Sequence, residues 1–223
     1  MRMMQRPESE APSGATHLGA RVTVRDLLRT YQEHRGKHPK GSFRMPVEAI
    51  GMARTPAALR SGFDSRPCIY YEYVVERQWK RKQREAALPL LGDQDSSSGQ
   101  DVLVAKRRSC AVFWIGERDG EEILVDPAGA VFESETVVER FERVGLASQT
   151  EAKIKVKEFP FVVTADVEMR ADVQTLGFKF IERVIPLNRV VAVRGLATDE
   201  TGALTLRRLP GANPSLVVRI ERS

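Results

Sequence analysis

The chain has 223 residues, of which 42% are hydrophobic and 29% are charged, and its formal net charge is +5. A chain of this length can bury a sizeable core, in one large domain or two small ones, and the composition excludes a collagen-like, low-complexity or wholly disordered protein. The 35 basic and 30 acidic residues are well mixed, whereas nucleic-acid-binding proteins more often concentrate their basic residues in one stripe. The charge pattern therefore argues against nucleic acid as the partner.

The N-terminal segment, 1–19, is polar, contains prolines and serines, and has no apolar run. We expect a flexible leader there, without a secretory signal. Nowhere does the sequence hold the ~18 consecutive apolar residues that a transmembrane helix needs. We therefore expect these residues in the cytoplasm or at the periphery of a membrane, with any membrane anchor outside them.

A helix is predicted from Val22 to Arg35, within an N-terminal helical segment at 20–40. Its apolar stripe has the spacing i, i+3, i+4 and i+7. The stripe consists of Val24, Leu27, Leu28 and Tyr31. Thr23 is a suitable N-cap, and a glycine and a proline end the pattern. His34 and His38 close the helix, but a metal site there would need a third ligand, and none is near in the sequence.

The strongest strand signal lies in the segment Ser65–Arg77, where aromatic and β-branched residues alternate with a period of two. Its two faces are Cys68, Tyr70 and Val74 on one side and Ile69, Tyr71, Tyr73 and Val75 on the other. Because both faces are largely apolar, we expect a central strand that is covered on both sides. Cys68 and Cys110 have apolar neighbours, so we expect two buried free thiols and a reducing environment.

Short strands separated by turns make up most of the remaining domain, 41–223. The predicted strands are Ser42–Ala53, Asp101–Gly116, Glu122–Asp126, Ala130–Phe132, Phe178–Ile185, Arg189–Ala197, Leu204–Leu206 and Ser215–Ile220. Glu135–Val144 is predicted as a short helix or part of a loop, and the polar segment near 83–101 as a mobile hairpin loop. This pattern predicts an α+β, β-rich fold: a mostly antiparallel sheet or partly open barrel with one N-terminal helix.

The sequence lacks the usual catalytic and metal-binding motifs. It has no glycine-rich phosphate loop, no Cys-x-x-Cys pair and only three histidines, all near the N-terminus. We therefore predict no catalytic residue, no metal site and no cofactor. Glu72 and Glu182 are unusual, because each lies in an otherwise apolar strand. Each either faces solvent at a sheet edge or is a buried carboxylate paired with an arginine such as Arg183 or Arg66.

A run of basic residues follows the central strand and continues beyond the polar loop. Its members are Arg77, Lys80, Arg81, Lys82, Lys106, Arg107 and Arg108. A solvated hairpin tip is the simpler interpretation of such a run. These seven residues are nevertheless the candidate binding residues, for an anionic partner or for the anionic surface of a membrane.

Three motifs together resemble one known family. Arg66–Tyr71 resembles its PCVYY strand, Val125–Ala130 its VDPxGA turn, and Gly177–Gly195 its longer segment with a central glutamate. The set is similar to the GIDE (mulan-like) family over about Val47–Ile220. The motif residues, for which the resemblance implies structural roles, are Pro67, Cys68, Tyr70, Tyr71, Asp126, Pro127, Gly129, Glu182 and Gly195.

The resemblance implies a domain beside a membrane. In animal and plant members this domain lies between two transmembrane helices, and a RING finger carries the ubiquitin-ligase activity. These 223 residues include neither the RING cysteines and histidines nor the transmembrane helices, and Asn188 stands where the family usually has glycine. The resemblance therefore implies the scaffold of the family and does not carry its ligase chemistry to this chain.

Three functions remain open. The first is a non-catalytic module that binds a protein or peptide, acting beside a membrane. The second is a protein related to E3 ubiquitin ligases whose activity is absent from this chain. The third is a β-barrel that binds single-stranded nucleic acid through aromatic residues beside the basic run. Those aromatic residues would be Tyr70, Tyr71, Tyr73 and Trp79. We favour the first, because the catalytic residues are missing and strands offer edges for pairing.

Overall fold

The computed structural model describes residues 19–40, 42–81, 98–118, 120–143, 151–156, 159–164, 173–212 and 216–221. The leader predicted at 1–19 lies outside these residues except for its last position. Most of the loop predicted near 83–101 also lies outside them, but residues 98–101 already belong to a strand. The structure therefore tests the predicted fold but not the two segments predicted to be flexible.

One part of the fold is a closed five-stranded barrel. Its strands are β2 (Arg44–Arg54), β6 (Phe113–Gly116), β7 (Glu122–Val125), β14 (Thr205–Arg207) and β13 (Val190–Thr198). They follow one another in the order β2-β6-β7-β14-β13, and β13 pairs again with β2, which closes the ring. All these pairings are antiparallel except β7 with β14. The β-rich fold with one helix is thus confirmed, and its barrel is closed.

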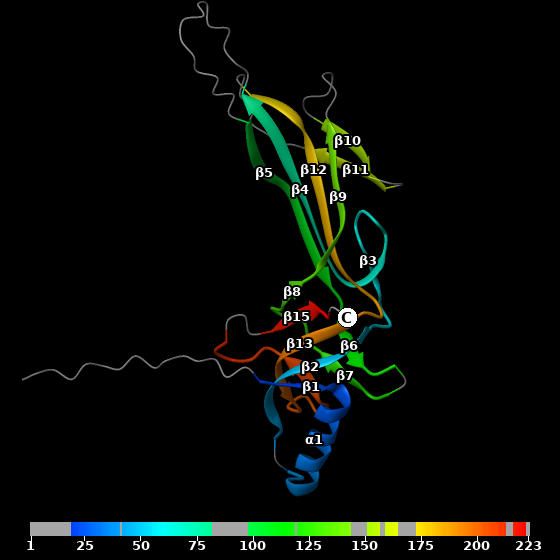
Figure 1. Cartoon of the computed structure of the whole chain (residues 1–223), viewed down its shortest axis with the longest axis vertical. Helices are drawn as coiled ribbons and strands as arrows, with labels where there is room; N and C mark the ends of the chain where they lie inside the picture. Colours follow the sequence, from blue (N-terminus) through cyan, green and yellow to red (C-terminus); the bar gives the residue numbers. More distant parts are fainter. Residues whose placement is uncertain are drawn as a thin grey trace, which may run out of the picture.

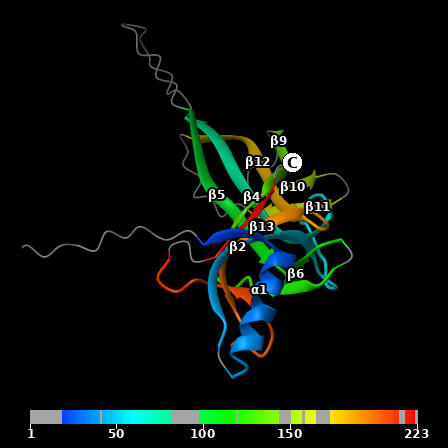
Figure 2. The same ribbon diagram turned by 60° about the horizontal axis from the view of Figure 1, so that its bottom comes forward.

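Three short strands and the helix surround the barrel. β15 (Val217–Ile220) pairs with β13, β8 (Val131–Glu133) pairs with β15, and β1 (Ala20–Thr23) runs parallel to β2. Helix α1 (Val24–Lys37) lies against the barrel strands at the end away from the rest of the molecule (Figures 1 and 2). Val24 and Leu27 on its inner face are buried in the barrel core, which explains the predicted apolar stripe.

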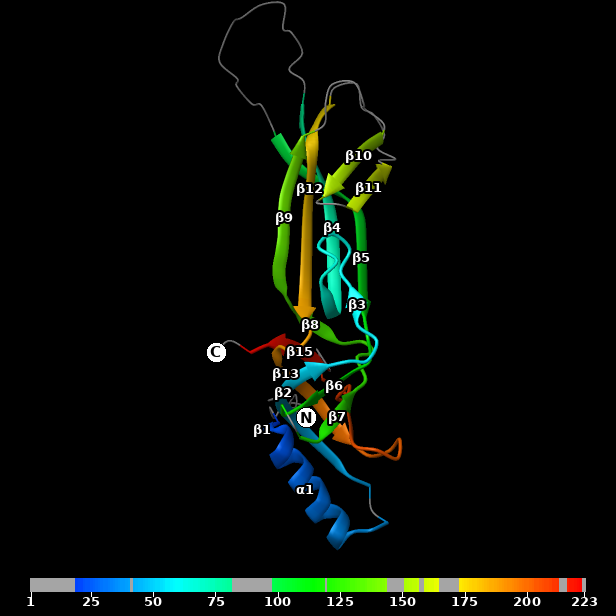
Figure 3. The same cartoon turned by 90° about the vertical axis from the view of Figure 1, so that its right-hand side faces the viewer.

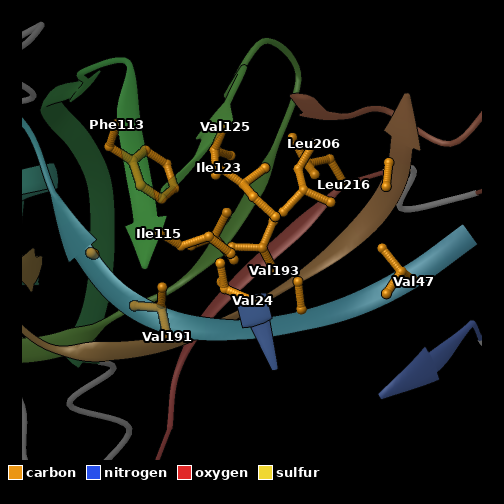
Figure 4. Close-up of a cluster of buried hydrophobic side chains, with 14 of the residues drawn as sticks. Val24, Val47, Phe113, Ile115, Ile123, Val125, Val191, Val193, Leu206 and Leu216 are labelled. Carbon is orange, nitrogen blue, oxygen red and sulfur yellow. The ribbon is translucent and has the colours of Figure 1, made fainter. Parts of the chain in front are cut away.

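The interior of the barrel is apolar (Figure 4). Every second residue of β2 from Val47 to Ala53 is buried, so that one face of this strand lines the interior. The other strands contribute larger side chains. The labelled members of this core are Val24, Val47, Phe113, Ile115, Ile123, Val125, Val191, Val193, Leu206 and Leu216. Together these buried side chains provide the main hydrophobic stabilisation of the barrel.

A second, elongated sheet projects from the barrel (Figure 1). It contains β3 (Leu59–Arg60), β4 (Pro67–Arg81), β12 (Val173–Pro186) and β9 (Glu135–Arg143) in the order β3-β4-β12-β9, and β5 (Ser98–Cys110) also pairs with β4. We call these five strands the extended sheet. The small hairpin of β10 (Glu151–Val156) and β11 (Phe159–Thr164) lies near its far end (Figure 3). The predicted central strand, Ser65–Arg77, is confirmed as part of β4 from Pro67 onward, and its first two residues precede the strand.

The extended sheet and the barrel share a core where they meet. Ile69, Tyr70 and Ile185, at the base of β4 and β12, belong to the same buried cluster as the barrel residues. The ring of Tyr70 stacks on Phe132 of β8 with the ring centroids 4.1 Å apart. Leu187 N also donates a hydrogen bond to the carbonyl of Pro67 across the junction. These contacts attach the base of the extended sheet firmly to the barrel.

The predicted N-cap of the helix is confirmed, although the helix begins and ends two residues later than predicted. The backbone N–H of Asp26 donates to the hydroxyl of Thr23 at 3.1 Å, and the helix ends at Lys37. The reason for the later start is that Ala20–Thr23 pairs with β2 as a strand. Sheet pairing therefore fixes the N-terminal boundary of the helix.

The single strand predicted from Asp101 to Gly116 is wrong, because the chain changes sheets within it. β5 ends at Cys110 and β6 begins at Phe113. Between them, Ala111 N donates to the carbonyl of Ile69, and Val112 is 52% exposed. The apolar run is therefore divided between the extended sheet and the barrel, a division that local alternation does not reveal.

The helix or loop predicted at Glu135–Val144 is also wrong, because Glu135–Arg143 forms strand β9. The spacing of its apolar residues is compatible with a helix, but the segment pairs along its length with β12. A register shift between Glu182 and Arg183 in that pairing shows a bulge in β9 near Val137. Tertiary pairing overrides the local pattern here.

Candidate binding surface of the extended sheet

The extended sheet has two chemically different faces. The face that we call inner carries Tyr71, Tyr73 and Val75 of β4, which pair with Val184, Glu182 and Phe180 of β12. The loop after β3 and the β10–β11 hairpin lie on the same side of this sheet (Figures 1 and 3). The outer face carries charged residues among apolar ones.

Glu182 is fully buried on the inner face and holds the loop after β3 against the sheet. Its carboxylate accepts hydrogen bonds from Phe63 N at 2.8 Å, Asp64 N at 3.0 Å and the Ser61 hydroxyl at 3.1 Å. The ring of Phe63 packs against the rings of Tyr73 and Phe180. The prediction of a buried carboxylate is confirmed, but its partners are two backbone amides and a hydroxyl, and the predicted arginine pairing is wrong.

Glu72 lies on the outer face at the centre of a charge ladder across three strands. Lys106 of β5 contacts its carboxylate at 2.8 Å, and Arg183 of β12 contacts it at 3.5 Å. On the same face, Lys179 pairs with Glu139 of β9. The hydrogen bond and charge of Lys179 lower the pKa of the Glu139 carboxyl. The predicted pairing of Glu72 with Arg183 is thus observed, and both side chains are partly exposed.

The motif residues on β4 are packing groups. Cys68, Tyr70 and Tyr71 are all buried. Burial, followed by the charge of Glu182, raises the pKa of the Cys68 thiol to about 11, and burial is also the main cause that raises the pKa of Tyr70 to about 12. Two of the four aromatic residues suggested for nucleic-acid stacking therefore lie in the core and offer no exposed platform.

The other motif residues form one tight turn and one close strand contact. The Asp126 carboxylate accepts a hydrogen bond from Ala128 N in the turn that contains Pro127, and Gly129 has a positive φ of 71°. At Gly195, a Cβ would lie 2.5 Å from the Arg207 carbonyl. Asn188 likewise adopts a left-handed φ of 58°, which asparagine tolerates. The structure gives these positions backbone roles.

The exposure of Cys110 differs from what the sequence predicted. It is the last residue of β5 and is exposed, whereas Cys68 is buried. The expectation of two buried thiols is therefore wrong for Cys110. Its apolar sequence neighbours, Ala111 and Val112, leave the extended sheet at this point, so they do not cover it.

The predicted basic residues do not form one cluster at a hairpin tip. Lys106, Arg107 and Arg108 are exposed, but they lie in the middle of the β4–β5 pairing, opposite Val74, Tyr73 and Glu72. Lys80 is exposed further along β4. Of the other three, Arg77 is only 9% exposed, Arg81 is described only by its backbone, and Lys82 lies outside the described residues. Sequence reasoning gave no signal that Arg77 would be buried.

Strand β5 is an edge of the extended sheet. It pairs with β4, and no other strand in the described part of the chain pairs with it. From Lys106 to Cys110 the pairing is regular, whereas two register shifts interrupt it between Val75 and Arg77 of β4. The regular stretch thus presents five residues along one free edge, the first three of them basic.

No group of three histidine, cysteine, aspartate or glutamate side chains suited to a metal ion occurs among the residues that the structure describes. Within the same residues, no helix has both the length and the apolar character needed to cross a membrane.

Comparison with known families identifies the family of the chain. A model of the GIDE family, described as E3 ubiquitin ligase, matches residues 94–218, more than half of the chain. The chain belongs to the GIDE family. The GIDE match runs from before β5 to the middle of β15 and is narrower than the resemblance seen from about Val47 to Ile220. Searches of curated proteins and of solved structures gave no match.

Proposed function

We propose that this chain is a non-catalytic binding module that recognises an extended segment of another protein along β5. The observation that carries the proposal is the one-sided pairing of β5 in the described part of the chain. A free edge presents backbone N–H and C=O groups that can bind an incoming strand, and side-chain contacts then select its sequence. The regular register from Lys106 to Cys110 suits such pairing.

The side chains of this edge favour an acidic segment. Lys106 and Arg108 lie on the outer face and Arg107 on the inner face, so both faces of an added strand would meet a cation. Glu72 already pairs with Lys106, but Arg107 and Arg108 make no ion pair with the part of the chain that the structure describes. Basic residues on an edge also discourage uncontrolled pairing with other edges. Complementary charge would thus provide selectivity.

The family relation fits this role in an E3-type system. The resemblance places ligase chemistry in a RING finger, and this sequence has two cysteines and three histidines, fewer than a RING finger uses to hold two zinc ions. We therefore propose that these residues bind a substrate or partner and that any ubiquitin transfer takes place elsewhere. A position beside a membrane is part of the same proposal and rests on the resemblance.

Site-specific crosslinking tests the binding surface. A photoreactive benzoylphenylalanine at Arg107 should crosslink a partner in cells, whereas the same group at Gln32, an exposed residue of α1, should not. Changing Lys106 and Arg108 to glutamine should reduce the crosslinking at position 107. Equal crosslinking at both positions, or no effect of the two glutamines, would contradict the proposal.

A second experiment tests the non-catalytic part. The purified chain is analysed for zinc and is incubated with ubiquitin, a ubiquitin-activating enzyme and a panel of ubiquitin-conjugating enzymes. We expect no stoichiometric zinc and no stimulation of ubiquitin transfer. Stoichiometric zinc together with ubiquitin transfer would show that the chain is itself a ligase.

A further inference from the structure

Strand β9 forms the second edge of the extended sheet, on the side away from β5. It pairs with β12, and no other strand in the described part of the chain pairs with it. In Figure 3, β9 borders the extended sheet on the left, and β12, β4 and β5 follow to the right. From Glu139 to Arg143 the pairing of β9 with β12 is regular, because the bulge near Val137 lies outside this stretch. These five residues therefore present a regular edge.

An aromatic side chain lies exposed at the centre of this edge. Phe141 is 40% exposed. Its ring lies against β12, where a Cβ on Gly177 would be 2.5 Å from the Phe141 Cζ atom. Lysine, proline or a bulge commonly protects an edge strand from pairing with another edge, and residues 139–143 contain none of these. The edge is therefore open to pairing with another strand.

The charges on this edge are complementary to themselves. The sequence is Glu139-Arg140-Phe141-Glu142-Arg143. An identical copy can pair with it antiparallel, so that Phe141 faces the partner's Phe141. Glu139 then lies opposite the partner's Arg143, and Arg140 lies opposite the partner's Glu142. Each of these unlike pairs occurs twice because the arrangement has twofold symmetry, and opposite-charge pairs across two strands stabilise the pairing.

No other register of the same five residues gives this match. Opposite residues of two paired strands point to the same face, so a twofold pairing places one residue opposite itself. A pairing centred on Arg140 or Arg143 would place two arginines opposite each other. One centred on Glu139 or Glu142 would place two glutamates there. Because like charges directly opposite each other are destabilising, the register centred on Phe141 is favoured.

The charges of the edge lie on both faces and are only partly paired within the chain. Arg140 and Glu142 lie on the inner face and pair with each other, whereas Glu139 on the outer face pairs with Lys179. Arg143 is exposed and makes no ion pair with the part of the chain that the structure describes. A second copy would thus add ion pairs on both faces of the sheet. The edge of β5 differs, since its three consecutive basic residues would repel those of a copy.

We propose that β9 pairs with β9 of a second copy of this chain, forming a twofold dimer centred on Phe141. The two extended sheets then join into one sheet, in which β9 of one copy lies beside β9 of the other. Strand β9 begins near the barrel, where Glu135 pairs with Arg189, and runs away from it (Figure 1). Because the strands pair antiparallel, the two barrels lie at opposite ends and do not meet.

The dimer has two further properties. Its interface consists of two strands of five residues, which is small, so we expect a reversible dimer. Both β5 edges remain free, so that one dimer would offer two copies of the binding surface proposed above and could bind a divalent partner more tightly. The dimer itself does not depend on the function proposed for β5.

Charge reversal in the full chain tests the dimer. An acidic variant carries Arg140→Glu and Arg143→Glu, and a basic variant carries Glu139→Arg and Glu142→Arg. In analytical ultracentrifugation the native chain should dimerise with rising concentration, and each variant alone should dimerise at least tenfold more weakly. An equimolar mixture of the two variants should restore the dimer, because every opposite pair of charged residues is then unlike.

A control variant and a cysteine variant make the test specific. Arg29→Glu with Lys37→Glu reverses two exposed charges on α1, and this variant should dimerise within twofold of the native chain. Phe141→Cys in a Cys110→Ser background places two thiols opposite each other, with Cα atoms about 4.5–5.5 Å apart, which suits a disulfide. Mild oxidation should crosslink this variant at least tenfold more than Thr136→Cys on the same strand.

The outcomes separate this proposal from the one for β5. Recovery of the dimer in the mixture, together with crosslinking specific to position 141, supports the pairing of β9. A native chain that stays monomeric, a mixture of folded variants that stays monomeric, or equal crosslinking at positions 136 and 141 overturns it. If a charge variant fails to fold, the cysteine variants alone decide. Partner crosslinking at Arg107 is measured separately, so either proposal can fail without the other.

Discussion

The barrel and the extended sheet differ in the side chains that they bury and in how their edges are paired. In the barrel, strands close on one another and the buried cluster consists of apolar side chains. In the extended sheet, β5 keeps a free edge in the described part of the chain, and Glu182 and Arg77 are buried among aromatic rings. The comparison indicates that the barrel is stabilised mainly by apolar packing, whereas the extended sheet also depends on buried polar contacts such as those that Glu182 makes with Ser61, Phe63 and Asp64.

The largest expected effect is in the barrel. Phe113 is fully buried in its core, and Phe113→Ala should lower the free energy of unfolding by about 3–5 kcal/mol. The neighbouring Val112 is 52% exposed, so Val112→Ala should change the free energy of unfolding by less than about 0.5 kcal/mol. Urea unfolding followed by circular dichroism measures both. A small effect of Phe113→Ala would show that the barrel is not the stable part.

Glu182→Ala should have the next largest effect, because it leaves three donors, two of them buried and one partly buried, without their acceptor. We expect a loss of about 3 kcal/mol, and a smaller loss for Glu182→Gln, which keeps one oxygen. The loop after β3 should become sensitive to trypsin after Arg60, while the barrel core remains protected. Glu139→Ala, at an exposed acid of β9, is the matched control. Protection at Arg60 in Glu182→Ala would mean that other contacts hold the loop.

Stability should fall as the pH rises from about 9 to 12. Cys68 and Tyr70 have pKa values raised from 9.0 to about 11 and from 10.0 to about 12. In this range the unfolded chain loses protons that the folded chain keeps, so unfolding becomes easier, by up to about 2 kcal/mol for each group. Tyr70→Phe should flatten the decrease between pH 10 and 12 in urea titrations, whereas Tyr31→Phe should not. An unchanged slope in Tyr70→Phe would contradict the burial of that hydroxyl.

The smallest effect concerns the helix that covers the barrel. Thr23→Ala removes the acceptor of the Asp26 N–H and should cost about 1 kcal/mol. Thr23→Ser keeps a hydroxyl and should restore most of this loss. Thermal unfolding of the two variants compares them directly. A similar loss in both would indicate that the threonine methyl group, and not the cap, supplies the stability.

The parts of the fold that depend on local pattern were predictable from sequence. The alternation around Tyr71 identified β4, the spacing of Leu27 with its neighbours identified the helix, and the quoted motifs identified the family. Barrel closure was not predictable, because it depends on pairing between β2 and β13, which are far apart in the chain. β9 was missed for the same reason, since its pairing with β12 outweighs its local spacing.

The candidate site was predictable only in part. Lys106, Arg107 and Arg108 were identified by charge, but their position in the middle of a free edge depends on the register with β4. The burial of Arg77 depends on which face of β4 the rest of the chain covers. The partners of Glu182 come from a loop more than a hundred residues earlier in the chain, and no local signal in Ser61–Asp64 marks them.

The pairing of β2 with β13 also has a consequence for biosynthesis. β2 leaves the ribosome early, whereas β13 is synthesised only after all five strands of the extended sheet. The nascent chain must therefore hold an unpaired, half-apolar β2 while more than half of the protein is synthesised. Such long-range closure is intrinsically slow and exposes the strand to aggregation. We expect the yield of folded protein to depend on chaperones that act during translation.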